Sequence, residues 1–169
     1  MTDAPIVSLE VSFGDAPPEA MVTPLCQSLS ELCRPVFEDE DAANRLRLAA
    51  HELLENIVKY SSQGACEFRV EVRRRGERSL TARVETRNVP LVTHRADADA
   101  RLAALHTAAD PHEHYDSVIA DSARRPAGSG LGLARIHAET EYRLQHRFEG
   151  QALVIIAEGE VWLEREALP

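Results

Sequence analysis

Strand-like and helix-like hydrophobic patterns follow one another along this chain, and their order constrains its fold more than any other feature of the sequence. Apolar residues alternate with polar ones over 7–13, 66–84 and 142–163, a pattern typical of strands with one solvent-exposed face. Between these runs, apolar residues recur at helical spacing. Because the helices are grouped between strand runs, we expect an α/β two-layer sandwich, with helices on one face of a mixed, mostly antiparallel sheet.

Local signals place the elements of the first half. Thr23, followed by proline, predicts the cap of the first helix, and Pro35 predicts its end. The acidic run 38–41 predicts the start of the best helix, whose core stripe is expected at Leu46, Ala49 or Ala50, Leu53 and Ile57. The expected elements are a strand over 7–13, helices over 23–34 and 41–60, a hairpin of strands over 66–72 and 80–84, and a short helix over 97–105.

The hydrophobic pattern weakens between 106 and 128. We expect a long connection there, with about one helical turn around 117–120. A segment of this length without structure of its own is usually functional or mobile in a compact domain. Beyond it the sequence predicts a helix over 131–141 and strands over 142–148, 153–157 and 161–163.

Composition narrows the range of partners and compartments. The 169 residues fit one compact domain, and 28 acidic against 19 basic residues give a net charge of −9, which disfavours nucleic-acid binding. No run approaches the ~18 apolar residues of a membrane helix, and no signal-peptide core follows the acidic start, so we expect a cytoplasmic protein. The three cysteines, expected as buried free thiols, are Cys26, Cys33 and Cys66.

Lys59 is the only lysine of the chain, which excludes two large classes of nucleotide-binding protein. A P-loop requires lysine at the end of its glycine loop, and the protein-kinase fold requires lysine on an early strand. If this chain binds ATP, it must hold the phosphates in another way.

The segment HELLENIVKY, at 51–60, carries the first candidate site. Glu52 and Asn56 are four residues apart on one predicted helix, so a carboxylate and an amide oxygen lie on the same face. Glu55 and Lys59 form a second pair at this spacing, for which we favour a structural ion pair.

The segment GSGLGL, at 128–133, carries the second candidate site. Its three alternating glycines free the backbone for left-handed and close-approach conformations just before a helix, where amide groups can bind phosphate. A flexible linker is an equal alternative for this segment taken alone.

Together these segments resemble the GHKL ATP-binding family of gyrase, MutL and histidine kinases, which has the Bergerat fold. HELLENIVKY is similar to its N-box and GSGLGLARI to its second glycine box, and the resemblance covers 40–157. The chain most resembles the anti-sigma factor serine/threonine kinases, and VETRNVP at 84–90 resembles their SiaB-like branch. The resemblance implies a single domain over 1–169 with a lid at about 106–128.

The resemblance also implies roles for individual residues. Asn56 would ligate Mg²⁺ through its side-chain oxygen, and Glu52 would act as general base on the attacking hydroxyl. Lys59, in the same box, is a further candidate for nucleotide binding. Arg124 and Arg125, in the lid, would contact the γ-phosphate or form a plain solvated pair. The triphosphate would meet the backbone of Gly128, Ser129, Gly130, Leu131 and Gly132.

One family element is missing from the chain. A DxGxG box should follow the second hairpin strand, where its aspartate accepts the adenine amino proton. The stretch found there is VETRNVP, without glycine. Asn88 is our candidate for the same hydrogen bond because it ends the strand, and Glu85 is the second candidate.

The function that the resemblance implies is ATP- and Mg²⁺-dependent phosphorylation of a serine or threonine on a small regulatory protein. The expected partner is an anti-sigma antagonist, STAS-like or SiaC-like, with a sigma factor as a further candidate and a homodimer left open. The main alternative is a catalytically degenerate GHKL domain that sequesters a partner. An ATP-driven clamp ranks last, because such enzymes use an additional transducer domain.

Overall fold

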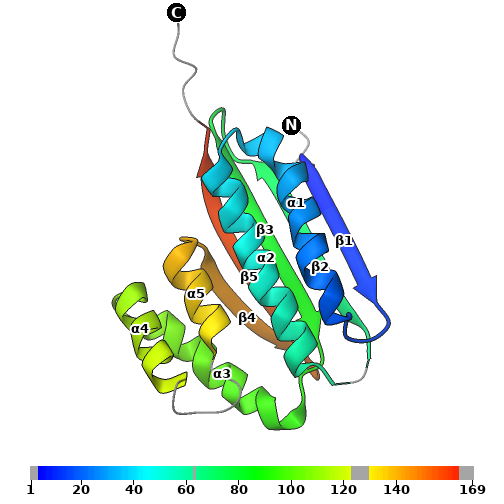
Figure 1. Ribbon diagram of the computed structural model, residues 1–169, viewed down its shortest axis with the longest axis vertical. Coiled ribbons are helices and arrows are strands. Elements are labelled where there is room, and N and C mark those ends of the chain that lie inside the picture. Colours follow the sequence, from blue (N-terminus) through cyan, green and yellow to red (C-terminus); the bar gives the residue numbers. More distant parts are fainter. Residues whose placement is uncertain (1–3, 63, 123–129, 164–169) are drawn as a thin grey trace, which may run out of the picture.

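The computed structural model describes residues 4–62, 64–122 and 130–163. Its five strands form an antiparallel sheet in the order β1-β2-β3-β5-β4, with α1, α2 and α5 over one face and α3 and α4 at one end (Figure 1). The elements are β1 (Val7–Phe13), the short 3-10 helix η1 (Glu19–Met21), α1 (Val22–Phe37), α2 (Glu40–Tyr60), β2 (Cys66–Arg74), β3 (Ser79–Asn88), α3 (Val92–Thr107), α4 (Pro111–Ser122), α5 (Leu131–Glu139), β4 (Arg143–Glu149) and β5 (Ala152–Trp162).

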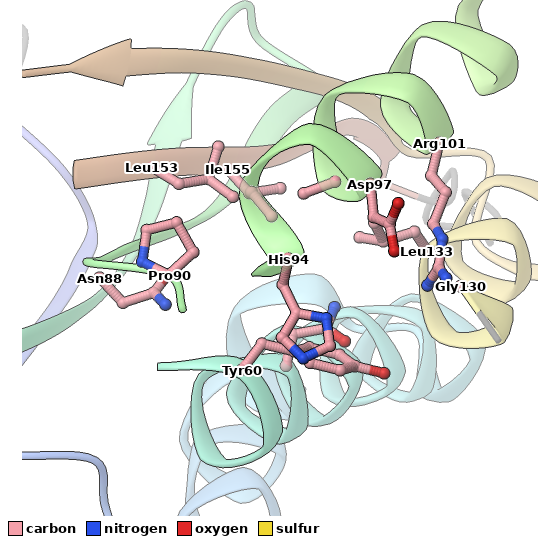
Figure 2. A pocket seen from close by; sticks show the side chains of 12 residues that line it. Tyr60, Asn88, Pro90, His94, Asp97, Arg101, Gly130, Leu133, Leu153 and Ile155 are labelled. Atoms are coloured by element: carbon pink, nitrogen blue, oxygen red, sulfur yellow. The ribbon is translucent and has the colours of Figure 1, made fainter. Parts of the chain in front are cut away.

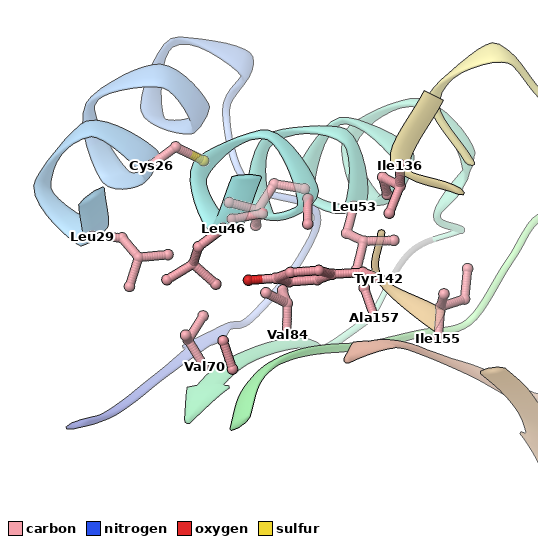
Figure 3. Packing of buried hydrophobic residues seen from close by; sticks show 14 of the residues in the cluster. Cys26, Leu29, Leu46, Leu53, Val70, Val84, Ile136, Tyr142, Ile155 and Ala157 are labelled. Carbon is pink, nitrogen blue, oxygen red and sulfur yellow. The ribbon is translucent and has the colours of Figure 1, made fainter. Parts of the chain in front are cut away.

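The core lies between the helices and one face of the sheet. Every second residue of β2 from Cys66 to Val72 is buried, and the helices cover this face. Tyr142 joins the core beside the aliphatic side chains (Figure 3). The predicted stripe of α2 is buried in full: Leu46, Ala49, Ala50, Leu53 and Ile57. The two-layer α/β sandwich is therefore confirmed, with antiparallel pairing between all neighbouring strands described.

The helix α2 begins where its acidic run predicts. The Asp39 Oδ1 atom accepts a hydrogen bond from the Asp41 backbone N–H at 2.8 Å and so caps the helix. Glu40 and Asp41, in the first turn, complement the helix dipole. The last turns of α2 then reach the end of β3. Among the described helices, none combines the length and the apolar character needed to cross a membrane.

The first helix differs from its prediction at both ends. Met21, not Thr23, is the N-cap of α1, and no side chain caps the helix. The helix also continues through Pro35 to Phe37. Pro35 lies in the last turn, where it removes one backbone hydrogen bond, whereas Phe37 is fully buried. Packing of Phe37 thus outweighs the local effect of proline.

The predicted long connection over 106–128 is wrong for the residues that the structure describes. The helix α3 extends to Thr107, and α4 occupies most of the remaining segment. Asp110 caps α4, because its Oδ1 atom accepts hydrogen bonds from the N–H groups of His112 and Glu113 at 2.7 and 3.2 Å. No residue of α4 is fully buried, so its apolar periodicity is weak and the helix was missed.

The strand β5 is continuous, although the sequence predicts two separate strands in this region. Gly159 interrupts the apolar pattern there. A Cβ atom on Gly159 would stand 2.3 Å from Cδ1 of Tyr142, so this glycine permits close packing of the ring against the strand. The break in the pattern is therefore a packing site within one strand.

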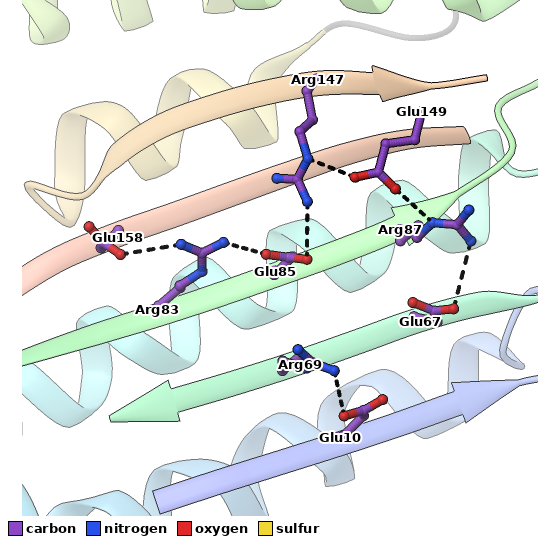
Figure 4. Close-up of polar contacts among 9 residues, drawn as sticks. All are labelled: Glu10, Glu67, Arg69, Arg83, Glu85, Arg87, Arg147, Glu149 and Glu158. Atoms are coloured by element: carbon purple, nitrogen blue, oxygen red, sulfur yellow. Dashed lines mark hydrogen bonds and ion pairs between the residues drawn. The ribbon is translucent and has the colours of Figure 1, made fainter. Parts of the chain in front are cut away.

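The face of the sheet opposite the helices carries ion pairs that cross the strands (Figure 4). Arg147 contacts Glu85 and Glu149, and Arg87 contacts Glu149 and Glu67. These side chains are partly exposed, so each pair contributes little stability, on the order of 0–1 kcal/mol. Their position shows that Glu85 points away from the helix layer.

Candidate functional site

The helix α2 brings two predicted side chains to one end of the molecule. Glu52 and Asn56 lie one turn apart on this helix. Asn56 lines a pocket formed by the ends of α2 and β3, the start of β5, α3 and the start of α5 (Figure 2). Its Nδ2 atom is buried and has no hydrogen-bond partner in the described part of the chain. Such a group is unfavourable unless a ligand completes its environment, so it marks the pocket as a candidate binding site.

Glu52 lies against the glycine segment. A Cβ atom on Gly132 would stand 2.5 Å from Glu52 Oε2, so the carboxylate occupies space that any side chain would fill. The Oε1 atom of Glu52 accepts a hydrogen bond from Arg135 Nη1 at 3.2 Å. Arg135 also pairs with Glu139. Because the Glu52 side chain is only 12% exposed, Arg135 compensates a largely buried charge and fixes its direction.

Gly130 is the N-cap of α5 and adopts the left-handed conformation with φ 68°. A residue with a Cβ atom is strained in this conformation by roughly 1–2 kcal/mol. The N-terminus of α5 carries the positive end of the helix dipole, which makes this end suitable for phosphate. The left-handed conformation of Gly130 and the close approach of Glu52 to Gly132 are the two features for which the sequence suggested glycine in this segment.

Asn88 and Glu85, the two candidates for adenine recognition, lie on opposite faces of β3. Asn88 lines the pocket, and its Nδ2 atom donates a hydrogen bond to Ser61 Oγ at 2.9 Å. This bond leaves Asn88 Oδ1 as the available acceptor. Glu85 forms ion pairs with Arg83 and Arg147 on the other face. The geometry therefore favours Asn88 and excludes Glu85 from the pocket.

Backbone hydrogen bonds join the end of α2 to the end of β3. The Ser62 N–H donates to the Val89 carbonyl at 2.7 Å, and the Leu91 N–H donates to the Tyr60 carbonyl at 2.9 Å. These bonds hold together the two elements that carry Asn56 and the strand-end asparagine. The pocket wall is thus built on a fixed frame.

The pocket has two chemically different ends (Figure 2). Near Asn88 it is lined mainly by rings and apolar side chains: Tyr60, Pro90, His94, Leu153 and Ile155. Toward α5 the lining adds two charged side chains and a glycine, Asp97, Arg101 and Gly130, beside the apolar Ala98 and Leu133. A flat heterocycle suits the first end and an anionic chain suits the second.

The remaining predicted site residues are not among the described residues that line the pocket. Lys59 forms an ion pair with Glu55, as favoured from the sequence, and the hydrogen bond that its Nζ atom donates to the Glu55 carboxylate raises the pKa of Lys59. Lys59 is not among the described residues that line the pocket. Leu131 is the first residue of α5. Four predicted residues lie outside the described part of the chain: Arg124, Arg125, Gly128 and Ser129.

The contribution of α3 to the pocket was not predicted. Asp97 and Arg101 reach it from a helix that the sequence indicated only by composition. Arg135 was also missed, because its contact with Glu52 joins residues far apart in the sequence. Only the spacing of three residues between Gly132 and Arg135, one helical turn, connects this arginine with the glycine box.

The fold agrees with comparisons to known proteins. The chain matches the histidine kinase-like ATPase domain over residues 15–156, and it belongs to that family. It is similar in fold to a chain in the crystal structure of the SiaB–SiaC complex from Pseudomonas aeruginosa, with a TM-score of 0.60, 14% identity and 88% of each chain covered. No curated protein sequence matches the chain. The N-box and second glycine box thus predicted the family correctly.

Domains of this family bind ATP with Mg²⁺, and the pocket residues fit both. Asn56 offers an amide oxygen, and magnesium takes few protein ligands because water and phosphate oxygens supply the others. Its buried Nδ2 atom has no hydrogen-bond partner among the residues that the structure describes, so the Asn56 amide is incompletely satisfied by them. At Gly132, the absence of a side chain leaves room for the Glu52 carboxylate beside the start of α5.

Proposed function

We propose that this protein is an ATP-dependent protein serine/threonine kinase of the anti-sigma, partner-switching type. Its substrate would be a small anti-sigma antagonist, STAS-like or SiaC-like. The observation that supports this best is the placement of two groups one helical turn apart on α2. Asn56 lines the pocket, and its buried Nδ2 atom has no partner among the described residues, whereas Glu52 lies against Gly132. Nucleotide binding needs the first group, whereas transfer of phosphate to a hydroxyl also needs the second.

Each residue has a defined role in this proposal. Asn56 ligates Mg²⁺, which neutralises part of the charge on the phosphates when it is bound. Glu52 accepts the proton of the partner's hydroxyl while that oxygen bonds to the γ-phosphorus and the bond to ADP breaks. Arg135 orients Glu52 through one carboxylate oxygen, and the second oxygen remains for the proton. Asn88 accepts a hydrogen bond from the adenine amino group.

Substitution of Glu52 tests the chemistry, with Glu55 of the same helix as the matched control. Glu52→Gln should retain nucleotide binding and lose about 100-fold or more of phosphotransfer, because general-base catalysis contributes about 10²–10⁴-fold. Glu55→Gln should transfer phosphate at close to the wild-type rate. Transfer of labelled γ-phosphate to the cognate partner measures both. Undiminished transfer by Glu52→Gln would refute its role as base.

The partner for this assay can be sought among small STAS-like or SiaC-like proteins encoded beside this chain. A second function, sequestration of the partner without catalysis, is favoured by the absence of glycine from VETRNVP. The same assay separates the two functions. A wild-type protein that binds its partner equally with and without Mg·ATP, and transfers no phosphate, would support sequestration.

A further inference from the structure

Arg101, on α3, lies across the start of α5. A Cβ atom on Gly130 would stand 3.0 Å from Arg101 Cδ and 3.5 Å from Nε and Nη1, so both the stem and the guanidinium border this glycine. Arg101 lines the pocket that contains Asn56 (Figure 2). It also lines an adjoining hollow between α3 and α4. Its side chain therefore stands where the two spaces meet, at the phosphate-suited end of the pocket.

The guanidinium of Arg101 has no hydrogen bond or ion pair with any residue that the structure describes. Asp97, one turn earlier, lines the same pocket but forms no ion pair with Arg101. Arg95, on the same helix, is engaged: it donates to the Gly150 carbonyl at 3.0 Å and lies over the Phe148 ring. A half-buried arginine without a counter-charge is unfavourable and suited to an anionic ligand.

We infer that Arg101 binds the terminal phosphates of the nucleotide and makes the pocket selective for nucleotides that carry them. This inference rests on the proposed ATP-dependent function. The planar guanidinium forms paired, charge-assisted hydrogen bonds with phosphate oxygens, and the N–H groups at the start of α5 can approach the same phosphates. Arg101 thus supplies the positive charge that other nucleotide-binding folds take from lysine, since Lys59 is engaged by Glu55.

The test compares nucleotides with different numbers of phosphates. Binding of Mg·ATP and Mg·ADP is measured by titration calorimetry, and binding of AMP by ligand-observed NMR, on the full chain. Arg101→Gln should weaken ATP binding by about tenfold or more, which corresponds to a lost charge-assisted hydrogen bond, and leave AMP binding unchanged. Arg101→Lys should be intermediate, because it keeps the charge and loses the planar fork.

Arg34→Gln is the matched control, because Arg34 is an exposed arginine on α1. It removes the same charge and should bind all three nucleotides as the wild type does. Wild-type ATP affinity in Arg101→Gln would overturn the inference and leave the proposed function intact. Equal losses of ATP and AMP binding would also overturn it, since they would indicate that Arg101 only shapes the pocket. Absence of nucleotide binding by the wild type would overturn both proposals.

Discussion

Gly132 contributes to the site because it has no side chain and therefore leaves room for Glu52. The Glu52 carboxylate fills the space beside it, and a methyl group there would force Glu52 to move. Gly132→Ala should therefore reduce phosphotransfer by about 100-fold, the effect expected when a reacting group is displaced by about 1 Å, with a smaller loss of nucleotide binding.

Gly14→Ala is the control for this substitution, because a Cβ atom on Gly14 would meet nothing within 4 Å. The control should transfer phosphate at the wild-type rate. Transfer by Gly132→Ala at the rate of Gly14→Ala would contradict the placement of the base against the glycine box.

Single residues of the site were predictable only where a local sequence pattern indicated their position. Glu52 and Asn56 stand out because helical spacing alone places them on one face. Asn88 could be chosen over Glu85 only as the strand's last residue, and the two faces of β3 now give the physical reason. Arg101 had no such signal, because its position depends on how α3 packs beside α5.

At the scale of elements, α3, α4 and α5 each carry a histidine whose charge the others can sense: His106, His114 and His137. Burial lowers the pKa of His137 on α5, and the charges of His114 and His106 lower it further, against the opposing backbone hydrogen bond of Tyr142. The folded protein therefore binds this proton less readily than the unfolded chain. Stability should fall as pH decreases through the ordinary histidine value of about 6.5.

Thermal unfolding between pH 7.5 and 5.5 measures this effect. His137→Gln should reduce the dependence on pH, whereas substitution of the exposed His112 on α4 by Gln should preserve it. If both variants keep the full wild-type dependence, the pKa shift of His137 does not contribute to stability.

Two of the elements that the sequence misjudged depend on tertiary packing that local signals do not contain. Pro35 should end α1 by local preference, yet burial of Phe37 extends the helix. Gly159 interrupts the pattern of β5, yet it accommodates Tyr142 within a continuous strand. The helix α4 was missed for a different reason, because it buries too little apolar surface to show a helical period.

At the scale of the whole molecule, the hydrophobic core between the helices and the sheet encloses the three cysteines. All three are buried and free, as expected from the sequence. Burial raises the pKa of Cys33 from the ordinary value of 9.0 to about 11. Burial also raises that of Cys26 to about 12, against the lowering effect of Arg47.

These thiols should therefore resist labelling in the native protein. At pH 8, Cys33 should react about 100-fold more slowly than in the denatured chain, because a rise from 9.0 to about 11 reduces the thiolate by that factor. With a disulfide-exchange reagent, all three thiols should react only after denaturation. Rapid native labelling of Cys33 would contradict the close packing of α1 on the sheet.

The central claim is that the pocket at the end of α2 binds Mg·ATP through Asn56. Thermal unfolding with and without Mg·ATP tests it most directly, with Asn44→Ala, an exposed position of the same helix, as control. At about 100 times the dissociation constant, Mg·ATP should stabilise the wild type and the control by about 2.7 kcal/mol, a rise of roughly 5–10 °C. Asn56→Ala should lose this rise or its dependence on magnesium. Absence of any rise in the wild type at millimolar Mg·ATP would contradict the claim.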